Sequence, residues 1–134
     1  MNRTRIIWIA NVIVVLSAAA AWQSVRNRWI EIQLSSADEQ TEIFSKMTDE
    51  ASESLRREPP DVRTAVELLG YTHNCYPSGS KQTHGSTLDR IVERSRSLAE
   101  RRIIEMLREA TGEDVGTYAE AWIRKFGNEG THSY

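Results

Sequence analysis

The chain has 134 residues, of which 40% are hydrophobic and 27% charged, and its formal net charge is -2. These values exclude a disordered tail and a protein with many membrane spans, and the balanced charge gives no general attraction to nucleic acid. The single cysteine cannot form an internal disulfide, and cysteine-based zinc or iron–sulfur sites need several cysteines. The length fits about one domain.

The first predicted element is an apolar helix near the N-terminus. Residues 6–25 carry no charge, and arginines stand on both sides of them: Arg3, Arg5, Arg26 and Arg28. A helix of twenty residues rises about 30 Å, which is enough to cross the hydrocarbon core of a bilayer. Trp8 and Trp22 lie near its ends, where aromatic rings favour the membrane interface. We therefore expect a membrane anchor within residues 1–28, with the span over about Arg5–Arg26.

A cleaved signal peptide is the alternative, because a basic start, an apolar run and small residues up to Ala21 supply all of its parts. Apolar residues continue beyond these alanines at roughly helical spacing, which favours retention. Arginines flank both sides equally, but the short basic N-terminus resembles a signal anchor. We expect a single-pass protein of the cell membrane with its domain outside the cytoplasm. Cleavage near Ala21 would instead give a secreted or periplasmic protein.

An acidic amphipathic helix is predicted next, over residues 29–58. Residues 29–61 carry nine acidic and three basic side chains. One stripe follows the spacing of a helix face: Ile30, Leu34, Ala37, Thr41, Phe44, Thr48, Ala51 and Leu55. The stripe predicts packing against the chain's own domain, and the alternative is a short coiled coil between copies. The larger side chains are our candidates for a partner interface: Ile30, Leu34, Phe44 and Leu55.

A small helical domain is predicted over residues 61–127, with helices near 62–71, 87–110 and 118–126 and a tail at 128–134. Prolines at 59 and 60 end the acidic helix, and Asp61 can cap the next one. In the helix near 87–110, the apolar stripe includes Val92, Ala99 and Ile103 and is widened by Ile91 and Leu98. Arg96 is assigned to the water-facing side of this helix. Thr117 and Glu120 have the spacing of a capping box for the last helix.

The polar segment 71–86 contains the candidate ligand-binding residues: His73, Cys75, Ser80, Lys81 and His84. Three chemistries fit these residue types: a histidine-activated thiol, a metal site formed by His73, Cys75 and His84, and anion binding near Lys81. The segment fails the nucleotide-loop pattern on both sides of Lys81. We favour a structural connection between two helices over all three chemistries.

Two stretches resemble known helical repeats. Residues 60–70, P-D-V-R-T-A-V-E-L-L-G, resemble the second helix of a HEAT repeat. Residues 111–116, T-G-E-D-V-G, with Ala121 and Trp122 downstream, are similar to a closing motif of bacterial HEAT-type helical chains. The whole layout resembles an uncharacterised family of bacterial membrane-anchored proteins. These resemblances imply a helical interaction module and no activity, although no second copy stands at a HEAT-like period.

The sequence thus predicts an all-α fold, with a single N-terminal transmembrane helix, an extended acidic helix and a small helical-hairpin domain. The expected function is a membrane-tethered interaction or scaffolding module, not an enzyme, without a cofactor or metal. Its expected partners are the lipid bilayer and a protein or a second copy, not nucleic acid. One alternative is a domain centred on residues 71–86 that binds a small ligand or anion or catalyses a reaction. The other is a secreted helical protein.

Overall fold

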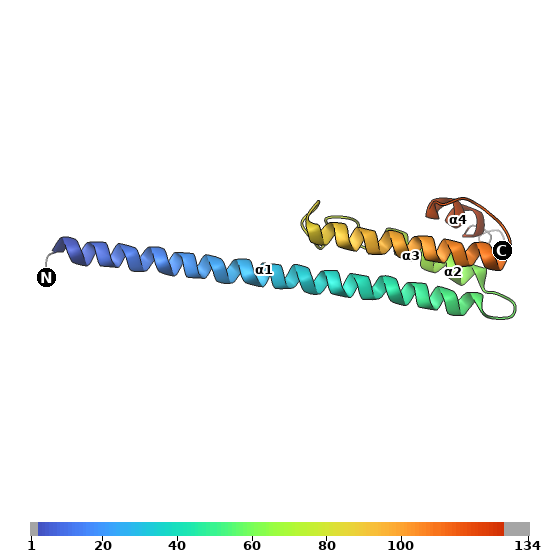
Figure 1. Ribbon diagram of the computed structural model, residues 1–134, viewed down its shortest axis with the longest axis horizontal. Coiled ribbons are helices and arrows are strands. Elements are labelled where there is room, and N and C mark those ends of the chain that lie inside the picture. The colour runs from blue at the N-terminus through green and yellow to red at the C-terminus, as the bar shows by residue number, and fades with distance from the viewer. Residues whose placement is uncertain (1–2, 128–134) are drawn as a thin grey trace, which may run out of the picture. The chain divides into compact units, whose positions relative to one another are not determined.

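The computed structural model describes residues 3–127, which form four helices and contain no strand. They are α1 (Arg3–Leu55), α2 (Val62–Asn74), α3 (Thr87–Thr111) and α4 (Ala119–Phe126) (Figure 1). The all-helical prediction, with one long apolar helix at the N-terminus, is therefore confirmed. The predicted tail over 128–134 lies outside the described residues. Residues up to Ser35 form one unit and those from Ser36 form a second.

The N-terminal unit consists of helix alone. Over residues 3–35 its apolar side chains are all exposed, including Trp8, Val15 and Trp22. Ile30 and Leu34, predicted to begin the packed stripe, are also more than half exposed. That part of the prediction is wrong, because both residues fall within this unit, which has no second element of its own to cover them.

The second unit packs the rest of α1 with α2, α3 and α4. In Figure 1, α3 runs in the same direction as α1, and α2 runs in the opposite direction. The main core takes residues from all four helices: Ala51, Ala65, Val66, Leu69, Ile103, Ile104, Leu107, Ala119 and Trp122. Burial of such side chains contributes about 1.5–3 kcal/mol for each large one. This apolar contact between helices explains why so short a sequence forms a packed unit.

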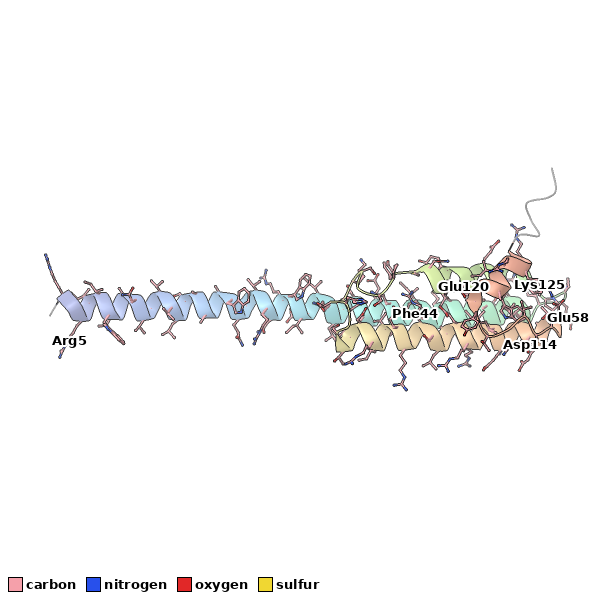
Figure 2. All side chains as sticks on the ribbon, turned by 90° about the horizontal axis from the view of Figure 1, so that it is seen from above. Arg5, Phe44, Glu58, Asp114, Glu120 and Lys125 are labelled. Atoms are coloured by element: carbon pink, nitrogen blue, oxygen red, sulfur yellow. The ribbon has the colours of Figure 1, made fainter. Side chains whose placement is uncertain are left out.

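A smaller core lies beside the segment that connects α2 to α3. It is formed by Ala37, Phe44, Val92 and Ala99, with Cys75 and Leu88 packed against it. Phe44 is labelled in Figure 2 and is only 1% exposed. This candidate for a partner interface is therefore a core residue, whereas Leu55 is partly buried at the edge of the main core.

The helix ends follow local capping chemistry. The Asp61 carboxylate accepts the backbone N–H of Thr64 at 3.0 Å, as expected for the start of α2. Gly112 ends α3 in the left-handed region with φ 69°, where glycine avoids a steric penalty. The predicted capping box of α4 is wrong: Tyr118 occupies the N-cap without a side-chain hydrogen bond, and Glu120 faces His73 instead.

The apolar face of α3 agrees with the predicted stripe at Val92, Ala99 and Ile103, which are buried, and differs from it at three positions. Ile91 and Leu98 are exposed, while Arg96, predicted to face water, is 8% exposed. The buried positions Asp89, Val92, Arg96, Ala99 and Ile103 follow one helix face. Arg96 was assigned to solvent because of its charge, although its position falls on the buried face.

Candidate functional site

The long connection between α2 and α3 is held by a buried carboxylate. Asp89, 3% exposed, stands in the first turn of α3. Its two oxygens accept three hydrogen bonds: from the Ser78 hydroxyl at 2.7 Å, the Gly79 N–H at 2.9 Å and the Gly85 N–H at 2.8 Å. These donors stabilise the ionised form and lower the pKa of Asp89. One side chain thus joins two turns of the connection to the start of α3.

A buried guanidinium holds the other end of the connection. Arg96 donates to the carbonyl of His73 at 3.2 Å and to the carbonyl of Tyr76. These carbonyls lie at and just beyond the end of α2. The last carbonyl groups of a helix have no backbone N–H partner within the helix. Arg96 therefore caps α2 from another helix. Its guanidinium also lies over the Phe44 ring, 5.5 Å from the centroid.

The structure separates the candidate residues of this segment. Ser80, Lys81 and His84 are exposed on the connection, and Lys81 Nζ lies 5.2 Å from the centre of the Tyr76 ring. Cys75 is half-buried at the end of α2, packed against the smaller core. Its thiol lies against the Tyr71 hydroxyl, and this contact raises the pKa of Tyr71.

His73 belongs to a different cluster. Its Nδ1 lies 3.1 Å from Glu100 of α3, and its Nε2 lies 3.3 Å from Glu120 of α4. The histidine thus connects α2 to both following helices. Over residues 3–127, no three His, Cys, Asp or Glu side chains are close enough to hold a metal ion. Among these described residues, His73, Cys75 and His84 thus do not form one cluster.

The connection nevertheless contains the three residue types of a hydrolytic triad. Ser78 Oγ lies 3.1 Å from His84 Nδ1 and 2.7 Å from Asp89. In a triad, the imidazole takes the proton of the nucleophilic hydroxyl and the carboxylate orients the imidazole. Here the hydroxyl donates to the carboxylate and His84 is an exposed neighbour, so the geometry supports a structural role for Ser78.

Ser78, Asp89 and Arg96 are not among the candidate site residues predicted from the sequence. One sequence feature indicates the two charged residues: they lie seven positions apart, and Val92 and Ala99 share their helical phase. A charged side chain in the phase of an apolar stripe, next to a long polar connection, predicts a buried anchor for that connection.

Residues 111–116, the second stretch described above, form the turn after α3. The Gly116 carbonyl accepts the Trp122 indole N–H at 2.9 Å and an Arg108 N–H at 2.8 Å. Asp114 accepts the Gly116 N–H at 3.1 Å and also Arg108 Nε at 3.0 Å. The conformation of Gly116, with φ 110°, favours glycine. The residues of this motif therefore position α4 against the core.

Two grooves follow α1 and α3 within the second unit. One, of about 190 Å³, is lined by residues that include Thr48, Asp49, Leu98 and Arg102. The other, of about 350 Å³, is lined by residues that include Leu55, Arg56, Met106 and Glu109. Neither groove contains the candidate residues His73, Cys75, Ser80, Lys81 or His84.

Most of the exposed large hydrophobic residues lie on the N-terminal unit. Within α1, a window of 18 residues has a mean hydropathy of 1.9, and none of it is buried. By length and composition this helix can cross a membrane, and a signal sequence has the same properties. Comparisons of the chain with models of protein families, with curated proteins and with solved structures found no match.

Proposed function

We propose that the protein is a membrane-tethered helical interaction module without catalytic activity. The observation that carries this proposal is the apolar window of α1, none of which is covered by protein. Leaving a Val, Leu or Ile side chain in water instead of an apolar environment costs about 1.5–3 kcal/mol. A run of such residues near the N-terminus is stable in lipid, with the arginines of both flanks at the interfaces.

The geometry of the 71–86 segment supports a structural role rather than chemistry. Its buried polar groups are used to hold the chain: Asp89 binds Ser78, Gly79 and Gly85, and Arg96 binds the end of α2. A ligand site instead combines a concave pocket with polar groups that remain available. Lys81 and His84 lie on the exposed side of the segment and line neither groove.

Each of the two units has exposed apolar residues outside the span, and each pair is a separate candidate for the proposed partner surface. Ile30 and Leu34 are 52% and 56% exposed, and on α3 Ile91 and Leu98 are 51% and 54% exposed. Exposed apolar surface of this kind is typical of interaction sites. The HEAT-like stretches, the acidic helix and the hairpin of α2 and α3 are consistent with a module of this class, placed outside the cytoplasm.

Fractionation of cells that express the full chain with a C-terminal tag tests the proposal. We expect the protein in the membrane pellet after a high-salt wash and its release by detergent. Replacing Val14 and Leu16 by arginine should move it to the supernatant, because charges near the centre of a span are costly. Replacing Glu39 and Glu42 by arginine is the matched control and should leave it in the pellet.

The intact mass of the purified protein distinguishes the anchor from a signal peptide. The uncleaved mass, recovered from the pellet, supports the proposal. A chain that begins near Trp22 identifies the secreted alternative. The uncleaved chain in a detergent-free supernatant contradicts membrane tethering altogether.

A further inference from the structure

A stripe along the N-terminal unit repeats with the period of a coiled coil. Eight positions follow a strict alternation of three and four residues: Trp8, Asn11, Val15, Ala18, Trp22, Val25, Trp29 and Ile32. Tryptophan recurs at spacings of 14 and 7, and every residue except Asn11 is apolar. A spacing of 3.5 residues keeps one seam directed toward a partner helix over several turns. The Trp and Val residues of this stripe are 57–71% exposed.

Asn11 is the exception that points to a partner. It lies five residues into the uncharged segment, about 7.5 Å along the helix axis from Ile6. Its amide has no hydrogen-bond partner among residues 3–127. An unpaired amide in hydrocarbon is costly, and lipid tails offer no hydrogen bond. Coverage by lipid alone therefore leaves this group unsatisfied.

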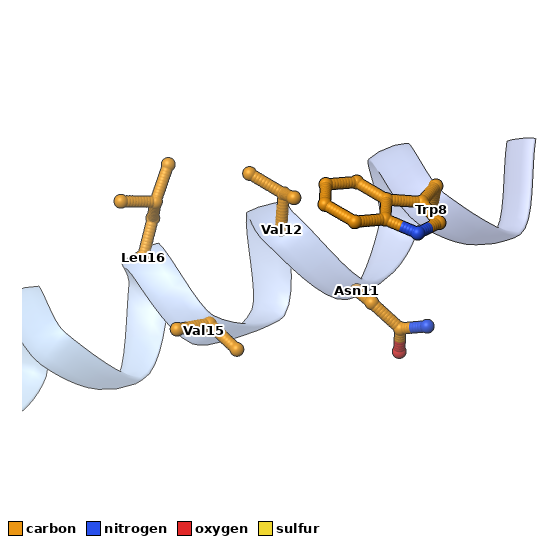
Figure 3. Close-up of a pocket in the computed structure, with 5 residues that line it drawn as sticks. All are labelled: Trp8, Asn11, Val12, Val15 and Leu16. Atoms are coloured by element: carbon orange, nitrogen blue, oxygen red, sulfur yellow. The ribbon is translucent and has the colours of Figure 1, made fainter. Parts of the chain in front are cut away.

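The surface of the helix near Asn11 is slightly hollowed. A shallow hollow of about 250 Å³ is lined by Trp8, Asn11, Val12, Val15 and Leu16 (Figure 3). The first four residues have the spacing i, i+3, i+4 and i+7, which is the arrangement that receives a side chain of the facing helix in a coiled coil. Membrane-interface preference explains tryptophans near the ends of a span, but not an amide on the stripe.

We propose that this stripe is the interface of a parallel dimer formed with a second copy of the chain in the membrane. The inference rests on the proposed membrane insertion. Identical chains insert in one orientation, so their helices are parallel and each residue of the stripe meets itself across a two-fold axis. Asn11 then faces Asn11 of the second copy. An amide both donates and accepts, so the two side chains satisfy each other without a third group.

The pairing of Asn11 also fixes the alignment of the two helices. A single polar residue in an apolar seam specifies the register and the number of helices, because any other alignment leaves the amide unpaired. Ala18 follows as a small residue that allows close approach of the two backbones. The dimer seam and the surface formed by Ile30 and Leu34 are distinct, because these two residues do not belong to the stripe.

Oxidative crosslinking of the full chain in phosphatidylcholine vesicles tests the proposal. In a Cys75→Ser background, Val25→Cys lies on the stripe, and Asn27→Cys lies on the opposite side of the helix. We expect a crosslinked dimer for Val25→Cys and little or none for Asn27→Cys. Adding Asn11→Leu should raise the dissociation constant of the dimer roughly 3- to 30-fold, whereas Asn11→Gln should preserve crosslinking.

Flotation of the same vesicles on a density gradient distinguishes failure of the dimer interface from failure of membrane tethering. Equal crosslinking of Val25→Cys and Asn27→Cys, or crosslinking that Asn11→Leu leaves unchanged, overturns the dimer interface while the protein still floats with lipid. Protein that does not float with lipid contradicts the proposed function itself. Dilution with excess lipid should reduce specific crosslinking, and crosslinking that is independent of dilution also overturns a reversible dimer.

Discussion

Asp89 illustrates how one carboxylate can shape a long connection. It receives two backbone N–H groups and one hydroxyl, and these hydrogen bonds go to a charged acceptor, which makes them stronger than neutral ones. Asp89→Asn removes the charge and one acceptor oxygen. We expect a loss of about 2–3 kcal/mol in the free energy of unfolding, measured by denaturant on the full chain in detergent. Asp38→Asn, on the exposed side of α1, is the control and should change little.

The same carboxylate predicts a pH dependence. The pKa of Asp89 is lowered below its ordinary value of 3.8, so folding favours the ionised form. This contribution is fully present above the ordinary value and is lost as the pH falls through the lowered pKa in the folded state. The difference in unfolding free energy between the wild type and Asp89→Asn should therefore shrink below about pH 3.8. A difference that stays constant down to pH 2 would contradict the assignment.

The exposed residues of the connection should be replaceable. Lys81→Ala and His84→Ala remove side chains that no core contact holds, so we expect changes within about 0.5 kcal/mol in unfolding free energy. Membrane fractionation and capture of protein partners should also be unchanged. If either variant folds normally but loses capture of a partner or an anion, the ligand-binding alternative is supported instead.

At the level of elements, α4 depends on a shared carbonyl. Trp122 is fully buried and stacks on Phe126, and its indole N–H binds the Gly116 carbonyl. Trp122→Phe keeps an aromatic ring but loses this hydrogen bond, and we expect a loss of about 1–2 kcal/mol in unfolding free energy. Trp122→Ala should cost about 3–5 kcal/mol because it also leaves a cavity.

Tyr118→Phe is the matched control for the indole hydrogen bond, because Tyr118 is 76% exposed. Hydrogen exchange of the backbone amides of α4 locates the effect. Faster exchange confined to α4 in Trp122→Phe would show that this helix detaches locally from the core. Unchanged exchange together with an unchanged free energy of unfolding would contradict the role of the Gly116 carbonyl.

Local chemistry explains which helices were predictable. Asp61 and Ser86 have side chains that accept backbone N–H groups, and they cap the starts of α2 and α3. Gly112 lacks a side chain and so favours the left-handed conformation that ends α3. These three helix ends could therefore be predicted from the residue types alone. Arg96 could not be placed in this way. Its burial depends on carbonyl groups at the end of α2, 20–23 residues earlier, and helical periodicity contains no information about them.

The candidate site shows the same division. Residue types indicated that segment 71–86 was unusual, and its long polar run predicted a connection between helices. The pairing of His73 with Glu100 and Glu120 depends on how three helices meet. The spacing of Thr117 and Glu120 predicted a local cap instead, because a short-range pattern cannot anticipate a carboxylate that finds a more distant partner.

At the scale of the whole molecule, the two units differ in what stabilises them. The second unit has two clusters of buried side chains, whereas the N-terminal unit has a single helix with exposed apolar residues. The distribution of charge along the sequence predicted this contrast. An uncharged segment comes first, an acidic segment follows, and the last segment has equal numbers of acidic and basic residues. Which surface covers the N-terminal helix depends on molecules outside the chain, so fractionation and crosslinking decide that question.

The double attachment of the segment between α2 and α3 has a consequence for proteolysis. Lys81 is an exposed trypsin site, but a protease must draw several residues of extended chain into its cleft before it can cut. Asp89 and Arg96 bind the connection on both sides of Lys81. Cleavage should therefore require that the hydrogen bonds of one of these residues to the connection first break. The rate of cutting after Lys81 would then report how often the segment detaches from α3.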